Sequence, residues 1–308
     1  MTRSQPAAPP SLSLTLTSHG AGVAEAAGVQ QLLAQARLAE AAGVDRLLFT
    51  DHVVMGEHTD RYPYGPFPLP PSAPWFEPLT LLAAIAAVTT RIELATGILI
   101  APLRPAAVLA KMLATLDTLA PGRLQIGIGT GWQREEFDAV GLDFDKAWTL
   151  LDDGVRAMKV LWREAPASFA SSTVNFEAVY STPFPREGSI PVWYGVKPTP
   201  RQAQRIAELG AGWIPISTDF DYVRDGVARI RDAFVAAGRD PATLQVRAHL
   251  PMHFDATGKG NLERTIADIP AMLEAGATVV EFEHHPYITD PAQLPEFYAR
   301  IAATRNLF

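Results

Sequence analysis

A short apolar run in the sequence ends in an aspartate followed by a histidine. Residues 45–49 read DRLLF, and Asp51 and His52 come after the next threonine. Histidine exchanges protons near neutral pH, and an adjacent carboxylate can fix its tautomer or cap the loop. We therefore predict that His52 is a general acid–base residue and that Asp51 orients it or its loop. The alternative is a loop histidine packed under the segment that follows.

A second candidate is a glycine-rich turn after another apolar run, made of Gly129, Thr130, Gly131 and Trp132. Glycines at the start of a short helix leave backbone N–H groups exposed, and such groups bind phosphate. The hydroxyl of Thr130 adds one more donor. Because tight turns also select glycine, the run has two interpretations, a phosphate-binding turn or a purely structural one.

A third candidate follows a later apolar run, at Gly195, Val196, Lys197 and Thr199. Thr199 is a suitable N-cap because Pro200 fits the first position of a helix, and Lys197 brings a positive charge. The segment predicts either a well-capped helix or a second anion-binding wall beside the first, since the two runs are expected to be neighbouring strands.

The seven histidines raise the alternative of a metallohydrolase. His284 and His285 are adjacent, so on a strand they point to opposite faces. His249 and His253 show no recognisable ligand spacing. The absence of cysteine excludes disulfides, thiolate metal sites and iron–sulfur clusters. We expect no metal site.

These candidates lie at the ends of strands in a repeated strand–helix pattern. Strands are predicted at residues 11–17, 45–49, 92–100, 123–128, 191–194, 212–216, 244–250 and 278–283. Helices are predicted at residues 29–42, 78–88, 106–119, 146–163, 200–209, 222–237, 262–275 and 294–303. The pattern predicts an α/β fold, a (β/α)8 TIM barrel whose active site lies at the carboxyl ends of the strands. A doubly wound open sheet is the alternative, but no G-x-G-x-x-G follows the first strand.

Two long irregular insertions interrupt the pattern, at residues 52–75 after the second strand and at residues 164–189 before the fifth. Long loops in compact domains often act as lids. In and just after the first insertion there is an aromatic cluster that packs on itself or forms a binding platform, made of Tyr62, Tyr64, Phe67, Trp75 and Phe76. We expect residues 1–10 to be a disordered tail and residues 11–308 to form one domain.

The overall composition limits the partners. The chain has 33 acidic and 26 basic residues, a net charge of −7, and no basic run of the kind that nucleic-acid binders carry. It has no stretch of about 18 apolar residues for a membrane span. Its first residues do not read as a signal peptide, so we expect a cytoplasmic protein.

Three segments together resemble the bacterial luciferase-like superfamily, and within it the deazaflavin (F420)-dependent oxidoreductases. They contain AEAAGVDRLLFTDHVVM, then IELATGILIAPLRP with LQIGIGTGWQREEFDAVG, then PVWYGVKPTPRQAQRIAELGAGWIPIS, between residues 36 and 217. The usual Gly-Gly-x-Ser-Pro at the end of the fifth strand is replaced by Gly195-Val196-Lys197-Pro198-Thr199-Pro200.

The resemblance implies a barrel that binds a flavin or deazaflavin at its C-terminal mouth. His52 then faces the ring or the substrate, and a non-proline cis bond between Gly97 and Ile98 lies behind the ring. The family's phosphate cradle maps onto the same segments that the residues themselves suggested: Gly129, Thr130, Gly131 and Trp132, with Gly195, Val196, Lys197 and Thr199. We expect His19 and Trp75 to contact the substrate.

The function predicted from these features is hydride transfer between coenzyme F420 and a small organic substrate, with His52 moving the proton and the first insertion excluding water. One alternative is an FMN-dependent monooxygenase that receives reduced flavin from a separate reductase. Another is a flavin-binding barrel without catalysis. Barrels of this family often pair, which implies a homodimer. Because the net charge repels an anionic cofactor, affinity must come from local donors, including Lys197 and Arg61 or Arg104 at the rim.

Overall fold

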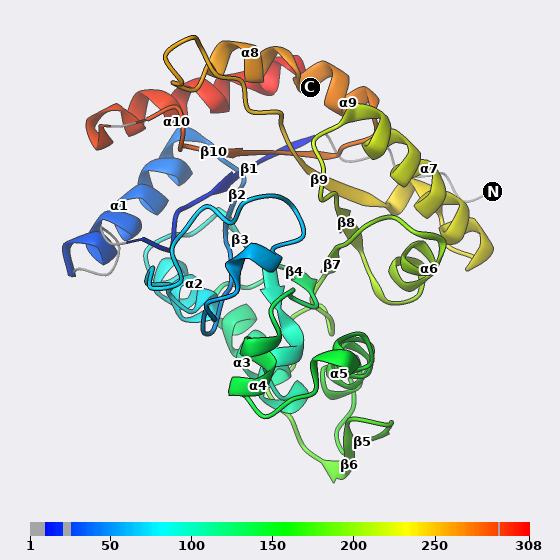
Figure 1. The fold of residues 1–308 in the computed structure, drawn as a ribbon. Helices are drawn as coiled ribbons and strands as arrows, with labels where there is room; N and C mark the ends of the chain where they lie inside the picture. Colours follow the sequence, from blue (N-terminus) through cyan, green and yellow to red (C-terminus); the bar gives the residue numbers. More distant parts are fainter. Residues whose placement is uncertain (1–9, 21–25, 289) are drawn as a thin grey trace. The chain divides into compact units, whose positions relative to one another are not determined.

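The computed structural model describes residues 10–20, 26–288 and 290–308 (Figure 1). The strands of the main sheet form a closed barrel in the order β1-β10-β9-β8-β7-β4-β3-β2, so the predicted barrel of the α/β class is confirmed. Its strands are β1 (Ser11–Thr15), β2 (Arg46–Phe49), β3 (Glu93–Ile100), β4 (Leu124–Gly129), β7 (Val192–Gly195), β8 (Gly212–Ile214), β9 (Gln245–His249) and β10 (Val279–Glu283).

Helices follow the strands along the chain, as the sequence pattern predicts. They are α1 (Ala26–Ala42), α2 (Pro78–Ala86), α3 (Ala106–Leu119), α4 (Arg134–Ala139), α5 (Ala147–Leu161), α6 (Pro200–Leu209), α7 (Phe220–Ala236), α8 (Leu262–Ala267), α9 (Ile269–Glu274) and α10 (Leu294–Ala303). None of the described helices is long and apolar enough to cross a membrane.

The chain divides into two compact units. The first consists of the described parts of Met1–Leu16, Leu38–Leu47 and Val192–Phe308. In it β1 pairs with β10, β10 with β9, β9 with β8 and β8 with β7, all in parallel. Helices α8, α9 and α10 lie along the outer side of β9 and β10 (Figure 1). Apolar side chains of these strands, Leu12, Leu14 and Phe282 among them, are buried and form the core.

The second unit consists of the described parts of Thr17–Arg37 and Leu48–Pro191. Its parallel strands β3 and β4 change register between Thr96 and Leu99. The second insertion, predicted to be irregular, instead contains an antiparallel hairpin of β5 (Ala167–Ala170) and β6 (Asn175–Val179). These strands are short, and β6 has no buried residue, so their sequences carry little of the apolar signal that marks a strand.

The prediction of one continuous helix over residues 262–275 is also wrong. It is two short helices that meet at Asp268, with Pro270 in the first turn of α9. Proline has no backbone N–H and favours the first turn of a helix, so it starts a new helix instead of continuing the old one. The predicted tail lies outside the described residues except for Pro10, and the single domain over residues 11–308 stays a prediction.

Candidate functional site

His52 is held by a carboxylate that the sequence did not single out. Its Nδ1 lies 3.1 Å from Glu136 Oε2, and the other oxygen of Glu136 accepts a hydrogen bond of 3.0 Å from the backbone N–H of Val53. The side chain of Glu136 is fully buried and that of His52 is 9% exposed. A carboxylate acceptor at Nδ1 keeps the proton on that atom, so Nε2 is left for proton exchange.

Aromatic rings enclose His52. The ring centres of Trp75, Phe67 and Trp132 lie 4.8, 5.8 and 6.0 Å from its imidazole. Tyr62 packs on Phe67 and Trp132 at 5.2 Å each. Burial raises the pKa of Tyr62, and the nearby Tyr64 raises it further. The first insertion therefore packs its aromatic residues around His52 and shields it from water.

His19 joins this cluster through a short antiparallel bridge with Trp75. The Gly20 N–H donates a hydrogen bond to the Pro74 carbonyl. The adjacent residues His19 and Trp75 have ring centres 4.4 Å apart. The two predicted substrate contacts thus lie together and next to His52. Within the described chain, the buried Ser18 Oγ and Trp75 Nε1 have no hydrogen-bond partner. Each is an unpaired buried polar atom that a polar ligand can satisfy.

Asp51 does not act on His52. Its Oδ2 accepts hydrogen bonds from Arg104 (2.8 Å) and from the backbone N–H of Ile100 (2.9 Å), and its Oδ1 accepts from Arg104 at 3.0 Å. Of the two roles predicted for Asp51, fixing the tautomer of His52 is wrong, because Glu136 lies at Nδ1, whereas orienting the loop stays a prediction. Asp51 instead ties the end of β2 to the end of β3.

The same interactions remove Arg104 from the predicted rim donors. Arg104 also donates to Glu77 Oε1 at 2.8 Å, and its side chain is only 9% exposed. Burial acts to lower the pKa of Arg104, but hydrogen bonds and charges from Asp51 and Glu77 raise it above its ordinary value. Arg61 is exposed and lies 4.0 Å from Glu135.

The glycine-rich turn follows β4 and packs against the end of β3. Gly131 has a φ of +73°, and a Cβ there would lie 2.8 Å from Ile100 Cγ2. A side chain is therefore excluded both by the backbone conformation and by the close approach. The following helix α4 has only six residues and carries Glu135 and Glu136 in its first turn, so its N-terminus adds little attraction for phosphate. Backbone groups of the turn remain as donors.

The structure confirms the expected bond geometry in β3. The peptide bond between Gly97 and Ile98 is cis. Both residues are half-buried, and they lie where the β3–β4 register shifts.

The remaining predicted cofactor contacts belong to the first unit. Thr199 caps α6 as expected, accepting a hydrogen bond from the Gln202 N–H at 3.3 Å. The Val196 carbonyl is taken by the buried indole of Trp213 at 2.8 Å, and Gly195 ends β7. Lys197 and Thr199 line a cavity of 280 Å³, with the other lining residues Pro198, Tyr222, Asp225, Gly226 and Arg229.

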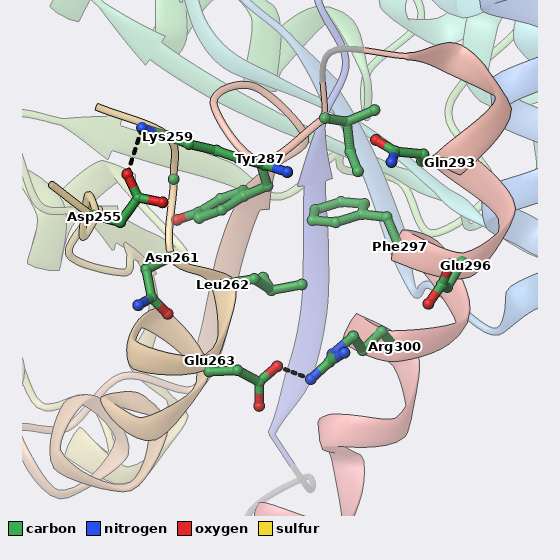
Figure 2. Close-up of a pocket in the computed structure, with 12 residues that line it drawn as sticks. Asp255, Lys259, Asn261, Leu262, Glu263, Tyr287, Gln293, Glu296, Phe297 and Arg300 are labelled. Carbon is green, nitrogen blue, oxygen red and sulfur yellow. Dashed lines mark hydrogen bonds and ion pairs between the residues drawn. The ribbon is translucent and has the colours of Figure 1, made fainter. Parts of the chain in front are cut away.

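A larger cavity, of 410 Å³, lies elsewhere in the first unit and contains none of the predicted site residues. Figure 2 shows the rings of Tyr287 and Phe297 on one side of it and the ion pair of Glu263 with Arg300 on another. Cavity size alone therefore does not locate the candidate site. Among the residues that the structure describes, no three His, Cys, Asp or Glu side chains are grouped as metal ligands.

Glu136 is the functional candidate that sequence reasoning missed. Glu136 lies four residues after Trp132 on α4, and a buried glutamate in a short polar helix (REEFDA) is not marked by any periodicity. The available signal was its position just after a predicted strand end, where barrel enzymes place reactive groups.

Residues 11–305 match the profile of the luciferase-like monooxygenase family. An uncharacterised protein of Mycobacterium tuberculosis is 35% identical over 164 residues, which are 53% of this chain and 58% of that protein. A pyrimidine monooxygenase of Allorhizobium ampelinum is 33% identical over 218 residues, 66% of this chain and 58% of that protein. An F420-dependent glucose-6-phosphate dehydrogenase of Kineococcus radiotolerans is 31% identical over 234 residues, 73% of this chain and 64% of that protein. The matches thus span between 58% and 64% of these relatives' lengths.

Solved structures with the same fold include an F420-dependent secondary alcohol dehydrogenase, with a TM-score of 0.77, 15% identity and coverage of 97% of this chain and 99% of that chain. They also include the monooxygenase RslO1 of Streptomyces bottropensis, with a TM-score of 0.73, 21% identity and coverage of 94% and 98%. At these identities the likeness shows the fold alone.

Proposed function

Because this chain belongs to the luciferase-like monooxygenase family, we propose that it is an oxidoreductase that transfers a hydride between coenzyme F420 and a small organic substrate. The observation that carries the proposal is the pairing of His52 with the buried Glu136 inside an aromatic enclosure. F420 is favoured over FMN by the residues that resemble the F420-dependent branch. The F420-dependent relative from Kineococcus radiotolerans, which aligns with 73% of the chain, also supports this choice.

The residues of the second unit fit a large polar cofactor. Ser18 Oγ and Trp75 Nε1 are buried donors that no described group satisfies, and burying them without a partner costs about 1–3 kcal/mol each. Gly131 keeps the end of the turn free of side chains. We assign contacts with the ring to Gly97 and Ile98, and contacts with the phosphate to Gly129, Thr130, Gly131 and Trp132.

The resemblance also implies cofactor contacts within the first unit. These residues are Gly195, Val196, Lys197 and Thr199. Lys197 and Arg229 bring two positive charges to the 280 Å³ cavity, against one negative charge from Asp225. The Val196 carbonyl already accepts a hydrogen bond from the Trp213 indole. The polar side chains that these four residues present to the cavity are those of Lys197 and Thr199.

Bound F420 supplies the carbon that gives or receives the hydride. His52 moves the accompanying proton at Nε2, since Glu136 holds Nδ1. His19 and Trp75 position the substrate, and the aromatic residues of the first insertion exclude water from the reacting groups. Asp51 acts as a positioning residue that fixes the ends of β2 and β3. A small-molecule substrate and a homodimer complete the proposal.

Parallel equilibrium titrations with F420 and FMN, followed by ligand fluorescence, test the cofactor. We expect saturable binding of F420 and a much weaker response to FMN. The reverse preference contradicts the F420 assignment and favours a monooxygenase that depends on a separate reductase. Binding of neither cofactor contradicts both and favours a barrel without catalysis.

A further inference from the structure

A column of polar side chains runs through the first unit along β1, β9 and β10. Glu281 is its centre: Oε2 lies 3.0 Å from Arg247 Nε, and Oε1 accepts a hydrogen bond from Thr15 Oγ1 at 2.6 Å. The same Oε1 lies 3.0 Å from His249 Nε2. The carboxylate and the guanidinium are each 1% exposed, whereas the imidazole is 42% exposed.

This column faces the inside of the barrel. Arg46 of β2 and Arg247 of β9 both stack over Trp193 of β7, at 5.4 and 5.7 Å from the ring centre. These three strands are not neighbours in the sheet, so their side chains can meet only in the interior. Barrel interiors are usually filled with branched apolar residues, and active sites lie at the carboxyl ends of the strands. His249 is the last residue of β9, so the buried charges end in an exposed imidazole at that edge.

We propose that His249 and Glu281 form a polar dyad that binds a small molecule with a hydroxyl group. Because the Glu281 carboxylate lies 3.0 Å from Nε2, the proton of the neutral ring is favoured on Nε2 and the lone pair on Nδ1. In the part of the chain that the structure describes, no hydrogen bond reaches His249 Nδ1. Nδ1 accepts a hydrogen bond from the O–H group of the ligand.

A purely structural role does not explain the arrangement. Arg247 already neutralises Glu281, and Thr15 already donates to the oxygen that His249 shares. Burial lowers the pKa of Arg247 to about 10, with Glu281 opposing the shift, so the guanidinium stays charged at neutral pH. A histidine present only to satisfy a buried carboxylate has no reason to leave 42% of its side chain exposed.

Other titratable groups define the ligand class. Glu283 is the second carboxylate near His249, and burial raises its pKa while the charge of His249 lowers it. A carboxylate ligand is disfavoured beside Glu283, because like charges repel. A neutral hydroxyl donor fits Nδ1. The hydroxyl contact of this dyad does not rest on the proposed function.

The test uses the full-length protein without cofactor, with ¹⁵N-labelled histidine and NMR detection of the ring nitrogens. The probe is 2-propanol, and acetone of the same size but without a donor is its control. We expect a saturable shift of His249 Nδ1 with 2-propanol that acetone does not reproduce, and a smaller shift in E281Q. An equal response to both probes, or no response of His249 Nδ1, overturns the proposal.

The matched control is His253, whose Nε2 lies 2.6 Å from Asp268 Oδ2 in the same unit. Carbethoxylation by diethyl pyrocarbonate, mapped by mass spectrometry, should label His249 several-fold faster than His253, and E281Q should slow only His249. H249N keeps an N–H for Glu281 and should retain the wild-type Tm and F420 affinity. If F420 fails to bind, the proposed function fails while these readouts still decide the dyad. Equal labelling of the two histidines contradicts the proposal.

Discussion

Glu136 Oε2 lies 3.1 Å from His52 Nδ1, although the two residues are 84 positions apart in the sequence. The second oxygen of Glu136 accepts from the Val53 N–H, so the carboxylate fixes both the ring and the backbone next to it. This contact makes Glu136 the positioning residue of the proposed reaction. It favours the His52 tautomer with the proton on Nδ1, and variants at position 136 can be tested for a change of that tautomer.

Replacing Glu136 by glutamine should remove the enforced tautomer, because an amide offers a donor as well as an acceptor to Nδ1. We expect kcat of E136Q to fall about 10²-fold, with F420 affinity unchanged. The ring ¹⁵N shifts of His52 should change from one tautomer to a mixture, and E136D should restore part of the activity. A wild-type kcat in E136Q contradicts a positioning role.

Arg104 should contribute to the stability of the fold and not to the binding of an anionic cofactor. R104M leaves Asp51, which is 1% exposed, without its cation, and breaking such a buried pair costs about 3–5 kcal/mol. Urea unfolding measures the loss. The control is R134M, whose partner Asp145 is 74% exposed, so that its loss should leave the urea midpoint almost unchanged. Equal effects of the two variants contradict the account of Asp51 as a tie between β2 and β3.

Gly131 and Gly141 provide a matched pair for the turn. Both have a positive φ, +73° and +75°, but only at Gly131 does an added Cβ meet another atom, Ile100 Cγ2 at 2.8 Å. Alanine should cost about 1 kcal/mol at either position from the backbone alone. G131A should lose more stability, and it should also weaken F420 binding, which G141A leaves intact. Unchanged F420 affinity in G131A contradicts the phosphate contact proposed for this turn.

His284 predicts a pH dependence of stability. Burial, and then the charge of His285, hold the pKa of His284 below its ordinary value of 6.5. The unfolded chain therefore binds a proton more readily than the folded one, so this contribution to stability is present above pH 6.5 and is lost as the pH falls through the folded pKa. Urea unfolding between about pH 7.5 and about pH 5.5 should show a smaller decline for H284Q than for the wild type.

The control for His284 is H58Q, because the side chain of His58 is 55% exposed. This variant should decline with pH as the wild type does. A wild-type slope in H284Q shows that another group controls the acid sensitivity.

The order of strands and helices was predictable because it depends on local patterns. Apolar runs such as LQIGIG and helix ends such as AAG are visible in short windows of sequence. The hairpin of β5 and β6 escaped prediction because its residues pack mostly against each other at the surface. The break at Asp268 was visible in Pro270, which the helical periodicity around it masked.

The site residues were predictable by position but not by partner. His52, His19 and Trp75 were identified, and the structure brings their rings together. Their hydrogen-bond partners were not identified, because the Glu136 and Arg104 contacts join segments 84 and 53 residues apart. One signal of the polar column was missed in the sequence. Arg247 and His249, and likewise Glu281 and Glu283, lie two residues apart and so share one face of strands that were interpreted as apolar.

Transfer of deuterium tests the central claim most directly. The wild-type protein is incubated without oxygen with F420 reduced by deuterium at its hydride-donating carbon and with a pool of small ketones and unsaturated carbonyl compounds. We predict that mass spectrometry finds deuterium on a carbon of one product, and that H52N lowers this transfer about 10²-fold without losing F420 binding. Deuterium that stays in the cofactor with every compound, or equal transfer by H52N, contradicts the proposed reaction.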